Sequence, residues 1–340
     1  MTIVAAEAFA FDAPLTRPYA IASGSADAVE MAFVVVRDAD GREGFGMASP
    51  AEEVTGETRD AALLSLRRYC DNGFVPVGGP GARAAIDMAA WDLAGKRVGK
   101  ACIDLLGRVQ PALPTSITIG VKDVAATLAE AAEYLARGFA VLKVKVGVDV
   151  DVDVERLAKL RERHGRSIGL RADGNQGYDE RALLRFLAAT RELDLEMIEQ
   201  PMPPGSEAFL ATLPAAVRTI LCADESVHDA EQLAAMTAAG CPYGIVNIKL
   251  QKCGGPGPAR ALAIACERLG LGVMWGCNDE SVLGIAAALH VALACRATRY
   301  LDLDGSLDLS ADAFAGGFVL RAGMLDTLPL PGLGVLRTDS

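Results

Sequence analysis

Five charged residues recur at nearly constant spacing through the chain. They are Lys145, Asp173, Glu199, Asp224 and Lys249, and the successive intervals are 28, 26, 25 and 25 residues. Each stands at the carboxyl end of a short apolar segment, such as LRAD or VNIKL. One such charge would indicate only an exposed residue at the start of a loop. Five in register indicate one shared structural position at which charged side chains converge.

Three of these residues are acids, and their types predict a metal site. Converging carboxylates repel one another unless a cation joins them. Asp173, Glu199 and Asp224 offer only oxygen ligands, which suit Mg²⁺, or alternatively Mn²⁺, better than Zn²⁺. The three histidines share no motif and the eight cysteines form no Cys-x-x-Cys pair, which disfavours a zinc site or a Ser-His-Asp triad. We therefore predict that the three acids bind one divalent cation.

The two lysines flank the acids and predict acid–base chemistry. A carbon acid next to a carboxylate is very hard to deprotonate, and a metal ion on that carboxylate stabilises the enolate as charge develops. Lys145 and Lys249 would then reach opposite faces of the substrate, one removing the α-proton and the other returning it. Lys143 shares a strand face with Lys145 and, with the metal ion, would lower the pKa of Lys145. The arrangement predicts a 1,1-proton transfer, which is a racemisation or an epimerisation.

Strands and helices alternate from residue 115 onward and must bring these residues together. β-Branched runs alternate with Ala- and Leu-rich stretches of helical period. Eight strands at this spacing predict a closed TIM-type β/α barrel, whose active site lies at the carboxyl ends of the strands. No Gly-x-Gly-x-x-Gly follows the first strand, which disfavours a dinucleotide-binding fold. The predicted strands are 116–121, 140–146, 168–173, 195–199, 219–224, 244–249, 271–276 and 299–303. The predicted helices are 124–137, 152–164, 180–192, 230–238, 258–269 and 282–294.

The first 110 residues lack this alternation and predict a separate α+β block. Gly41 and Gly44–Gly46 predict that the second turn of this block is flexible. The Gly- and Pro-containing tail after residue 305 does not continue the barrel pattern. The predicted strands of the block are 3–11, 31–37 and 43–47, and its predicted helices are 58–70 and 81–98. We predict a capping domain over 1–112, a barrel domain over 113–309 and a tail over 310–340 that returns to pack against the cap.

Length and composition agree with two folded domains and exclude several classes of partner. The chain has 340 residues, of which 51% are hydrophobic, and domains average roughly 150 residues. A net charge of −11 disfavours nucleic acid, which requires a basic face. No apolar run approaches the roughly 20 residues of a membrane span, and the amino terminus lacks a basic signal region. The scattered cysteines indicate the reduced thiols of a cytoplasmic protein. The partner that we expect is a small-molecule substrate. These properties do not decide between a monomer and a homo-oligomer.

Several motifs are specific in combination. They are PLTRPYAIASGS (14–25), KVKVG (143–147), RADGNQGY (171–178), IEQPMP (198–203), ADES (223–226), NIKLQKCGG (247–255) and LDLDG (301–305). Together they resemble the enolase superfamily, in its muconate lactonizing enzyme branch. The resemblance covers nearly the whole chain and implies an α+β capping domain, a modified (β/α)₇β barrel and magnesium-assisted enolate chemistry. Carried over position by position, the resemblance implies that the three acids bind the metal. It also implies that Lys145 and Lys249 are the acid–base pair. The resemblance further implies that Lys143 lies beside the substrate carboxylate or beside Lys145.

The LDLDG motif discriminates within that branch. Asp302 and Asp304 face the same way at the end of the last strand, and they resemble the Asp-x-Asp pair with which dipeptide epimerases receive the α-ammonium of a dipeptide. A pair that only caps the next segment is the structural alternative. o-Succinylbenzoate synthases and N-acylamino acid racemases share the lysines and the metal but bind substrates without a free ammonium. We predict a magnesium-dependent epimerase acting on the C-terminal residue of L,L-dipeptides, with those enzymes or another enolate-forming lyase as the alternative.

Side-chain preference is less clearly specified by the sequence. Epimerases of alanyl-glutamate carry an arginine in the first loop, whereas this chain has Ser23 near that place, so a preference for Ala-Glu is not expected. The segment WGCNDES would place Asn278, Asp279 and Glu280 near the pocket. Acids there and in the cap either favour a cationic substrate side chain or are simply solvated. The cap acids are Asp27, Glu30, Glu52 and Glu53.

Overall fold

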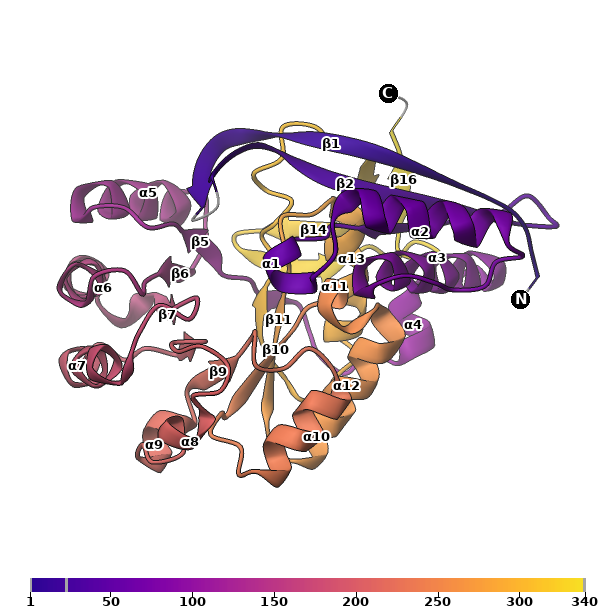
Figure 1. The fold of residues 1–340 in the computed structure, drawn as a ribbon. Coiled ribbons are helices and arrows are strands. Elements are labelled where there is room, and N and C mark those ends of the chain that lie inside the picture. Colours follow the sequence, from indigo (N-terminus) through magenta and orange to yellow (C-terminus); the bar gives the residue numbers. More distant parts are fainter. Residues whose placement is uncertain (1, 22–23, 339–340) are drawn as a thin grey trace.

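The computed structural model describes residues 2–21 and 24–338 and consists of a β/α barrel beside a smaller α+β domain (Figure 1). The predicted parallel barrel sheet is confirmed, because eight strands neighbour one another in chain order from β5 to β12. A parallel bridge between Thr115 and Leu301 nearly closes the barrel. The strands are β5 (Ile117–Ile119), β6 (Val141–Lys145), β7 (Gly169–Asp173), β8 (Met197–Glu199), β9 (Leu221–Ala223), β10 (Ile245–Ile248), β11 (Gly272–Gly276) and β12 (Thr298–Asp302).

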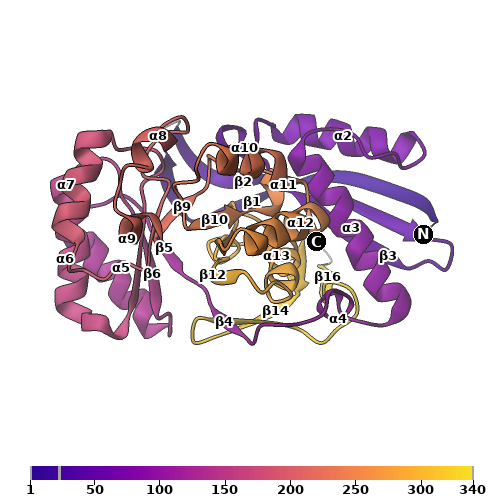
Figure 2. The same cartoon turned by 90° about the horizontal axis from the view of Figure 1, so that it is seen from below.

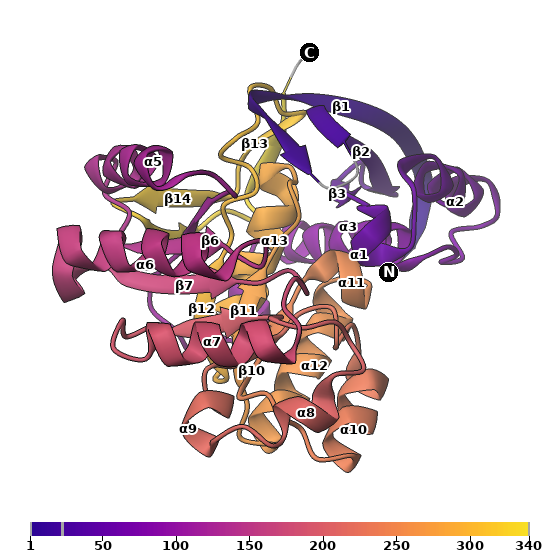
Figure 3. The same cartoon turned by 60° about the vertical axis from the view of Figure 1, so that its left-hand side comes forward.

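Helices lie between each barrel strand and the next, which is the expected (β/α)₇β arrangement. Asp123, Asp149, Asp179 and Asp229 begin four of them, because each side chain accepts a hydrogen bond from a backbone amide of the first turn. Between β8 and β9, where no helix was predicted, the chain forms only single turns, too short to show a helical period. Helices α5, α6 and α7 lie side by side along one flank (Figure 3). The helices are α5 (Val124–Ala136), α6 (Val150–His164), α7 (Glu180–Thr190), α8 (Glu207–Leu210), α9 (Ala215–Arg218), α10 (Ala230–Ala238), α11 (Leu250–Cys253), α12 (Pro256–Arg268) and α13 (Val282–Ala292).

The barrel interior is filled by side chains near the amino ends of the strands. Met197, Cys222, Ile245 and Met274 are buried together there, and Tyr300 packs against them. A packed lower layer of this kind closes the barrel from below. Polar side chains of the barrel therefore meet at the opposite end, where the strands have their carboxyl ends.

The cap is an antiparallel sheet covered by two helices. Its strands are β1 (Ile3–Ile21), β2 (Gly24–Asp38) and β3 (Glu43–Ala48), and α2 (Arg59–Asp71) and α3 (Pro80–Val98) pack on it. The side chains of β2 alternate between two apolar clusters, so this strand is buried on both faces. From below, the cap lies at one end of the molecule and the α6–α7 flank at the other (Figure 2).

Two predictions for the cap were wrong. The first two strands extend well beyond 3–11 and 31–37, because antiparallel pairing continues to Ile21 and Gly24. The prolines of β1 are tolerated because β1 is an edge strand. Gly44 and Gly46 lie within β3 and not in a turn. A Cβ atom on Gly46 would lie 1.8 Å from the Ala85 carbonyl oxygen, so the missing side chain allows α3 to approach closely.

The tail lies along the seam between the cap and the barrel. The ring of Phe314 is 5.2 Å from that of Phe33 and 5.1 Å from that of Phe45, both in the cap. The Leu333 amide donates to Asp92 of α3 at 2.8 Å, and the tail strands also contact α13 of the barrel. The domain boundaries at 112 and 309 stay a prediction. The remaining elements are α1 (Glu52–Thr55), α4 (Cys102–Leu106), β4 (Leu113–Pro114), β13 (Phe314–Gly316), β14 (Phe318–Arg321), β15 (Met324–Thr327) and β16 (Val335–Arg337).

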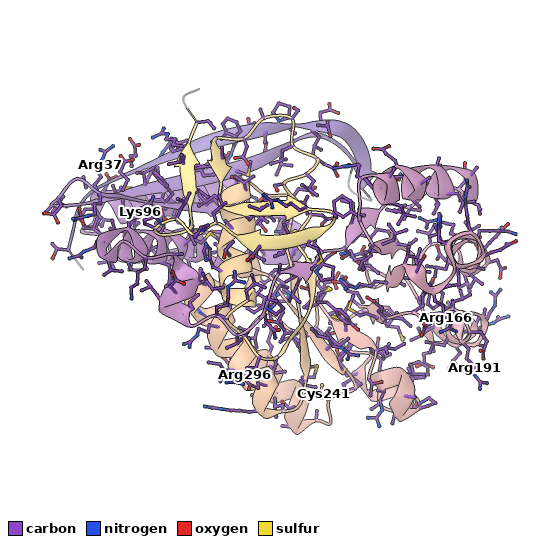
Figure 4. The ribbon with its side chains drawn as sticks, turned by 180° about the vertical axis from the view of Figure 1, so that it is seen from behind. Arg37, Lys96, Arg166, Arg191, Cys241 and Arg296 are labelled. Atoms are coloured by element: carbon purple, nitrogen blue, oxygen red, sulfur yellow. The ribbon has the colours of Figure 1, made fainter. Side chains whose placement is uncertain are left out.

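The outer surface carries charged side chains at both ends of the molecule. Arg37 and Lys96 lie at the cap end, and Arg166 and Arg191 lie at the opposite end (Figure 4). Arg166 pairs with Asp194 in solvent, where an ion pair adds little stability. Among the described residues, none of the helices has the length and apolar character needed to cross a bilayer.

Candidate active site

The five charged residues of the repeating series lie at or just beyond the ends of five neighbouring strands. Lys145, Asp173 and Glu199 are the last residues of β6, β7 and β8, and Asp224 and Lys249 follow β9 and β10 directly. The strand register pairs Lys145 with Asp173 and Asp173 with Glu199. The spacing in the sequence therefore corresponds to adjacency around one end of the barrel.

Lys145 is held on two neighbouring side chains. Its Nζ atom lies 2.7 Å from Asp173 Oδ2 and donates a hydrogen bond of 2.8 Å to Asn175 Oδ1. Burial alone would raise the pKa of Asp173, but Lys145 and Lys143 outweigh it and lower the pKa to about 2. Asp173 is thus a firmly ionised carboxylate beside a lysine that is still partly open to solvent.

Lys249 shares its carboxylate with a second lysine. Lys249 Nζ lies 2.8 Å from Asp224 Oδ2, and Lys252 Nζ lies 2.5 Å from Asp224 Oδ1. Burial would lower the pKa of Lys249, but Asp224 and Glu199 outweigh it and hold that pKa well above its ordinary value. The pKa of Asp224 lies well below its ordinary value because the two lysines overcome the effect of burial.

Lys143 lies deeper in the barrel, among three carboxylates. Its Nζ atom is 3.4 Å from Glu199 Oε2 and 3.5 Å from Asp173 Oδ2, and it also contacts Asp302. Burial, followed by repulsion from Asp173, raises the pKa of Glu199 to about 8. Asn247 donates to the other oxygen of Glu199 at 2.5 Å. The acids at this end of the barrel therefore carry more negative charge than the buried site accommodates easily.

The donor set fits a hard divalent cation. Asp173 and Asp224 both raise the pKa of Glu199, so the three acids lie within electrostatic reach of one another. In the part of the chain that the structure describes, no three carboxylate, imidazole or thiol groups are arranged to hold an ion, and lysines lie on the carboxylates. A cation would relieve the repulsion that the lysines now offset. Oxygen-only ligands of this kind suit Mg²⁺.

The two acids of the LDLDG motif have different surroundings. Asp302 is buried, contacts Lys143 and accepts a hydrogen bond of 2.5 Å from Ser116 Oγ. Asp304 is partly exposed and accepts from the Thr118 amide at 2.8 Å. Burial, followed by the Asp302 charge, raises the pKa of Asp304 to about 7. A cationic group placed beside the pair would relieve this repulsion.

The predicted pocket residues after β11 connect the barrel to the cap. Asn278 Nδ2 donates to the Ser49 carbonyl at 2.9 Å, and Ser49 Oγ donates to the Asp279 carbonyl at 2.5 Å. Glu280 is buried and accepts from Gln251 at 3.1 Å, and burial raises the pKa of Glu280 to about 7. A role of these three residues in substrate binding stays a prediction. Ser23 lies outside the described residues.

Sequence reasoning missed three side chains that contact the charged series. Asn175 contacts Lys145, Asn247 contacts Glu199, and Lys252 contacts Asp224. Asn247 lies two residues before Lys249, so strand alternation would have placed both on one face. Lys252 lies three residues after Lys249, which is one turn of helix. The signal for Asn175 was weaker, because it lies in a loop whose course the sequence does not specify.

Comparisons with known proteins agree with this geometry. Residues 5–107 match the family described as "Mandelate racemase / muconate lactonizing enzyme, N-terminal domain", and residues 126–338 match "Enolase C-terminal domain-like". The chain is 46% identical to the L-Lys-D/L-Arg epimerase of Methylococcus capsulatus, over 96% of each chain. It is 31% identical to the L-Ala-D/L-Glu epimerase of Bacillus subtilis, over 99% of this chain and 97% of that one.

Solved structures show the same similarity. The crystal structure of a dipeptide epimerase from Methylococcus capsulatus, complexed with Mg and the dipeptide L-Arg-D-Lys, matches with a TM-score of 0.95 and 45% identity, over 99% of this chain and 100% of that one. A substrate-liganded L-Ala-D/L-Glu epimerase from Bacillus subtilis matches with a TM-score of 0.90 and 28% identity, over 99% of each chain. With both domains matched and the strand-end residues in place, the chain belongs to the mandelate racemase/muconate lactonizing enzyme family of the enolase superfamily.

Proposed function

We propose that the protein is a magnesium-dependent dipeptide epimerase that inverts the α-carbon of the C-terminal residue of L,L-dipeptides. The observation that carries the proposal is the pair of lysines at the ends of β6 and β10, each on a different acid of the same cluster. One base at each side of a substrate is the requirement for proton transfer between two faces of one carbon. Relatives at 46% identity are named as epimerases of this kind.

The residues of the chain divide the work of the reaction. Asp173, Glu199 and Asp224 would hold Mg²⁺, which when bound stabilises negative charge developing on the substrate carboxylate. Lys145 or Lys249, in its neutral form, removes the α-proton from one face. For Lys249 that form requires a cation to neutralise the charges of Asp224 and Glu199, which otherwise raise its pKa. The opposite lysine, in its ammonium form, delivers a proton to the other face. Reversal of the two roles converts the product epimer back, so the same site serves both directions.

Asp302 and Asp304 fit the N-terminal ammonium of a dipeptide. β12 lies four strands from β8 in the sheet, and its Leu301 bridges to Thr115 just before β5, so the pair lies across the barrel from the strand that carries Glu199. Burial, followed by repulsion from Asp302, raises the pKa of Asp304 to about 7. An ammonium group beside the pair would relieve that repulsion and a carboxylate would increase it. This charge pattern favours a dipeptide over an N-succinylated amino acid.

A preference for cationic side chains is the finer part of the proposal. Asp27, Glu30 and Glu52 are exposed on the cap, and Asp279 lies in the loop after β11, where its carbonyl accepts a hydrogen bond from Ser49 of the cap. Relatives in Methylococcus capsulatus and Desulforapulum autotrophicum, both 46% identical, are named L-Lys-D/L-Arg epimerases. Acidic side chains around a pocket attract Lys and Arg side chains over the neutral or acidic alternatives. A cytoplasmic location and a homo-oligomeric state, expected from the sequence, stay predictions.

The test is incubation of defined L,L-dipeptides in deuterium oxide with Mg²⁺. We expect deuterium at the C-terminal α-carbon and accumulation of the L,D epimer, with kcat/KM for Lys- and Arg-containing dipeptides at least about tenfold above that for L-Ala-L-Glu, equivalent to 1.4 kcal/mol. Chelation of the metal should abolish both signals. Absence of deuterium from every dipeptide would contradict the epimerase, and a product that has lost a β-leaving group would indicate the lyase. Equal rates for L-Ala-L-Glu would contradict only the cationic preference.

A further inference from the structure

A buried polar group on helix α6 holds the end of the strand that carries Lys145. Arg156 is fully buried, and its guanidinium donates to the Lys145 carbonyl at 2.6 Å and to the Gly120 carbonyl at 2.6 Å. Its Nε donates to Thr127 Oγ1 at 2.8 Å. One side chain thereby ties the backbone of Lys145 to the end of β5 and to α5. Hydrogen bonds from a charged donor are the stronger kind.

Asp153, one turn earlier on α6, holds the other side of the same strand end. Its Oδ2 atom accepts from the Gly147 amide at 2.9 Å and from the Tyr178 hydroxyl at 2.9 Å. Asp153 and Tyr178 are both buried. Arg156 and Asp153 therefore bracket Lys145, one at its own carbonyl and the other two residues later.

Tyr178 extends this connection to the loop that holds the Lys145 ammonium. Tyr178 ends the segment RADGNQGY, and Asn175 of that segment accepts a hydrogen bond from Lys145 Nζ. The two loops pack without space for a side chain, since a Cβ atom on Gly147 would lie 2.3 Å from the Gly174 carbonyl oxygen. The backbone of Lys145 and the partner of its ammonium are thus fixed to one turn of one helix.

The contacts of Lys249 are made by other residues. Lys249 lies on Asp224, which Lys252 also holds, and Lys252 donates to the carbonyls of Asn247 and Val227. These residues belong to β10, α11 and the loop after β9. The Asp153 carboxylate and the Arg156 guanidinium contact the backbone around Lys145, and the Tyr178 hydroxyl contacts Asp153. These three groups make none of the Lys249 contacts just described, so their disturbance acts first on Lys145.

We infer that Asp153, Arg156 and Tyr178 are positioning residues for Lys145. Their loss should slow removal of the α-proton from the one epimer that Lys145 serves and leave the other epimer nearly unaffected. Small displacements of a catalytic group reduce rates steeply, because proton transfer requires a specific distance and direction. The inference rests on the proposed function, in which each lysine serves one face.

The experiment compares α-proton exchange of the L,L and L,D epimers of one dipeptide in deuterium oxide. Lys145→Ala identifies the epimer that depends on Lys145. Tyr178→Phe, which removes one buried hydroxyl, should slow exchange of that epimer about tenfold and the other less than about twofold. Tyr134→Phe is the matched control, because Tyr134 is equally buried and its hydroxyl donates to Glu130 within α5. It should leave the ratio of the two rates unchanged.

A second measurement does not depend on turnover. Hydrogen exchange of the peptide spanning 143–149 should be faster in Tyr178→Phe and in Asp153→Asn than in the wild type, and unchanged in Tyr134→Phe. Equal slowing of both epimers, or no slowing with unchanged hydrogen exchange, would overturn the inference. A wild-type protein that exchanges neither epimer would instead contradict the proposed function, and the hydrogen-exchange comparison would still decide the positioning role.

Discussion

The two lysines of the active site occupy halves that are built differently. The Lys145 side chain is 28% exposed and divides its ammonium between Asp173 and the neutral amide of Asn175. The Lys249 side chain is 12% exposed and shares Asp224 with Lys252, whose side chain is 1% exposed. One half is completed by a polar amide near solvent, and the other by a second buried cation. Because charge is costly to bury, the Lys249 half depends more on its charge balance.

Removal of each lysine should have the largest effect and would show whether the halves act on opposite faces. Lys145→Ala and Lys249→Ala are each expected to reduce epimerisation about 10²- to 10⁴-fold, the range for loss of a general acid–base group. Each variant should still exchange the α-proton of one epimer, and the two variants should retain different epimers. Proton NMR in deuterium oxide measures both the rate of epimerisation and the exchange of the α-proton. Retention of the same epimer by both variants would contradict the two-base arrangement.

Replacement of Lys252 should destabilise the Lys249 half through its charge. Lys252→Met leaves Asp224 short of one of its two cations in a buried site, and we expect the free energy of unfolding to fall by about 3 kcal/mol. Lys252→Arg should recover part of this loss. Asn175→Ala, the corresponding change beside Lys145, removes one hydrogen bond near solvent and should cost about 1 kcal/mol. Denaturant unfolding measures the free energy of unfolding of each variant. Equal losses in Lys252→Met and Asn175→Ala would mean that the two halves do not differ in charge dependence.

Protonation of His290 should have the smallest effect and should not distinguish the halves. His290 lies at the seam, where its Nδ1 accepts from the Ile103 amide at 3.0 Å, and burial lowers its pKa to about 4. The unfolded chain binds this proton near pH 6.5, so the contribution of His290 is present above that pH and is lost as pH falls toward 4. We expect the His290 contribution to fall by about 1 kcal/mol between pH 7 and about 5.5, and we read it as the difference from a variant that lacks the imidazole.

The matched variant for this prediction is His290→Gln, which cannot titrate. The unfolding free energy of the wild type relative to His290→Gln should fall by about 1 kcal/mol over the same pH range. The ratio of exchange rates for the two epimers should be the same in His290→Gln and the wild type, since the residue touches neither lysine. An unchanged pH dependence of stability would contradict the proposed environment of His290.

The barrel was predictable from the sequence because its signals are local. The predicted strand over 140–146 appears as β6 (Val141–Lys145), and the predicted helix over 230–238 has the same bounds in α10. Aspartate caps and β-branched runs favour a helix start or a strand through contacts with residues only a few positions away in the sequence. The cap was less predictable, because the length of β1 is set by pairing with β2 and Gly46 is required by a helix some forty residues later.

The sequence by itself determined which chemistry the protein can perform. Residue type and a spacing near 25 residues placed two lysines and three acids at equivalent strand ends, because strand period and helix length are local properties. Only the tertiary structure decided which lysine lies on which carboxylate, and that Asp302 contacts Lys143 from 159 residues away. Near-closure of the barrel brings its first and last strands together. Such pairings depend on sheet geometry and burial across the whole domain, which no single segment specifies.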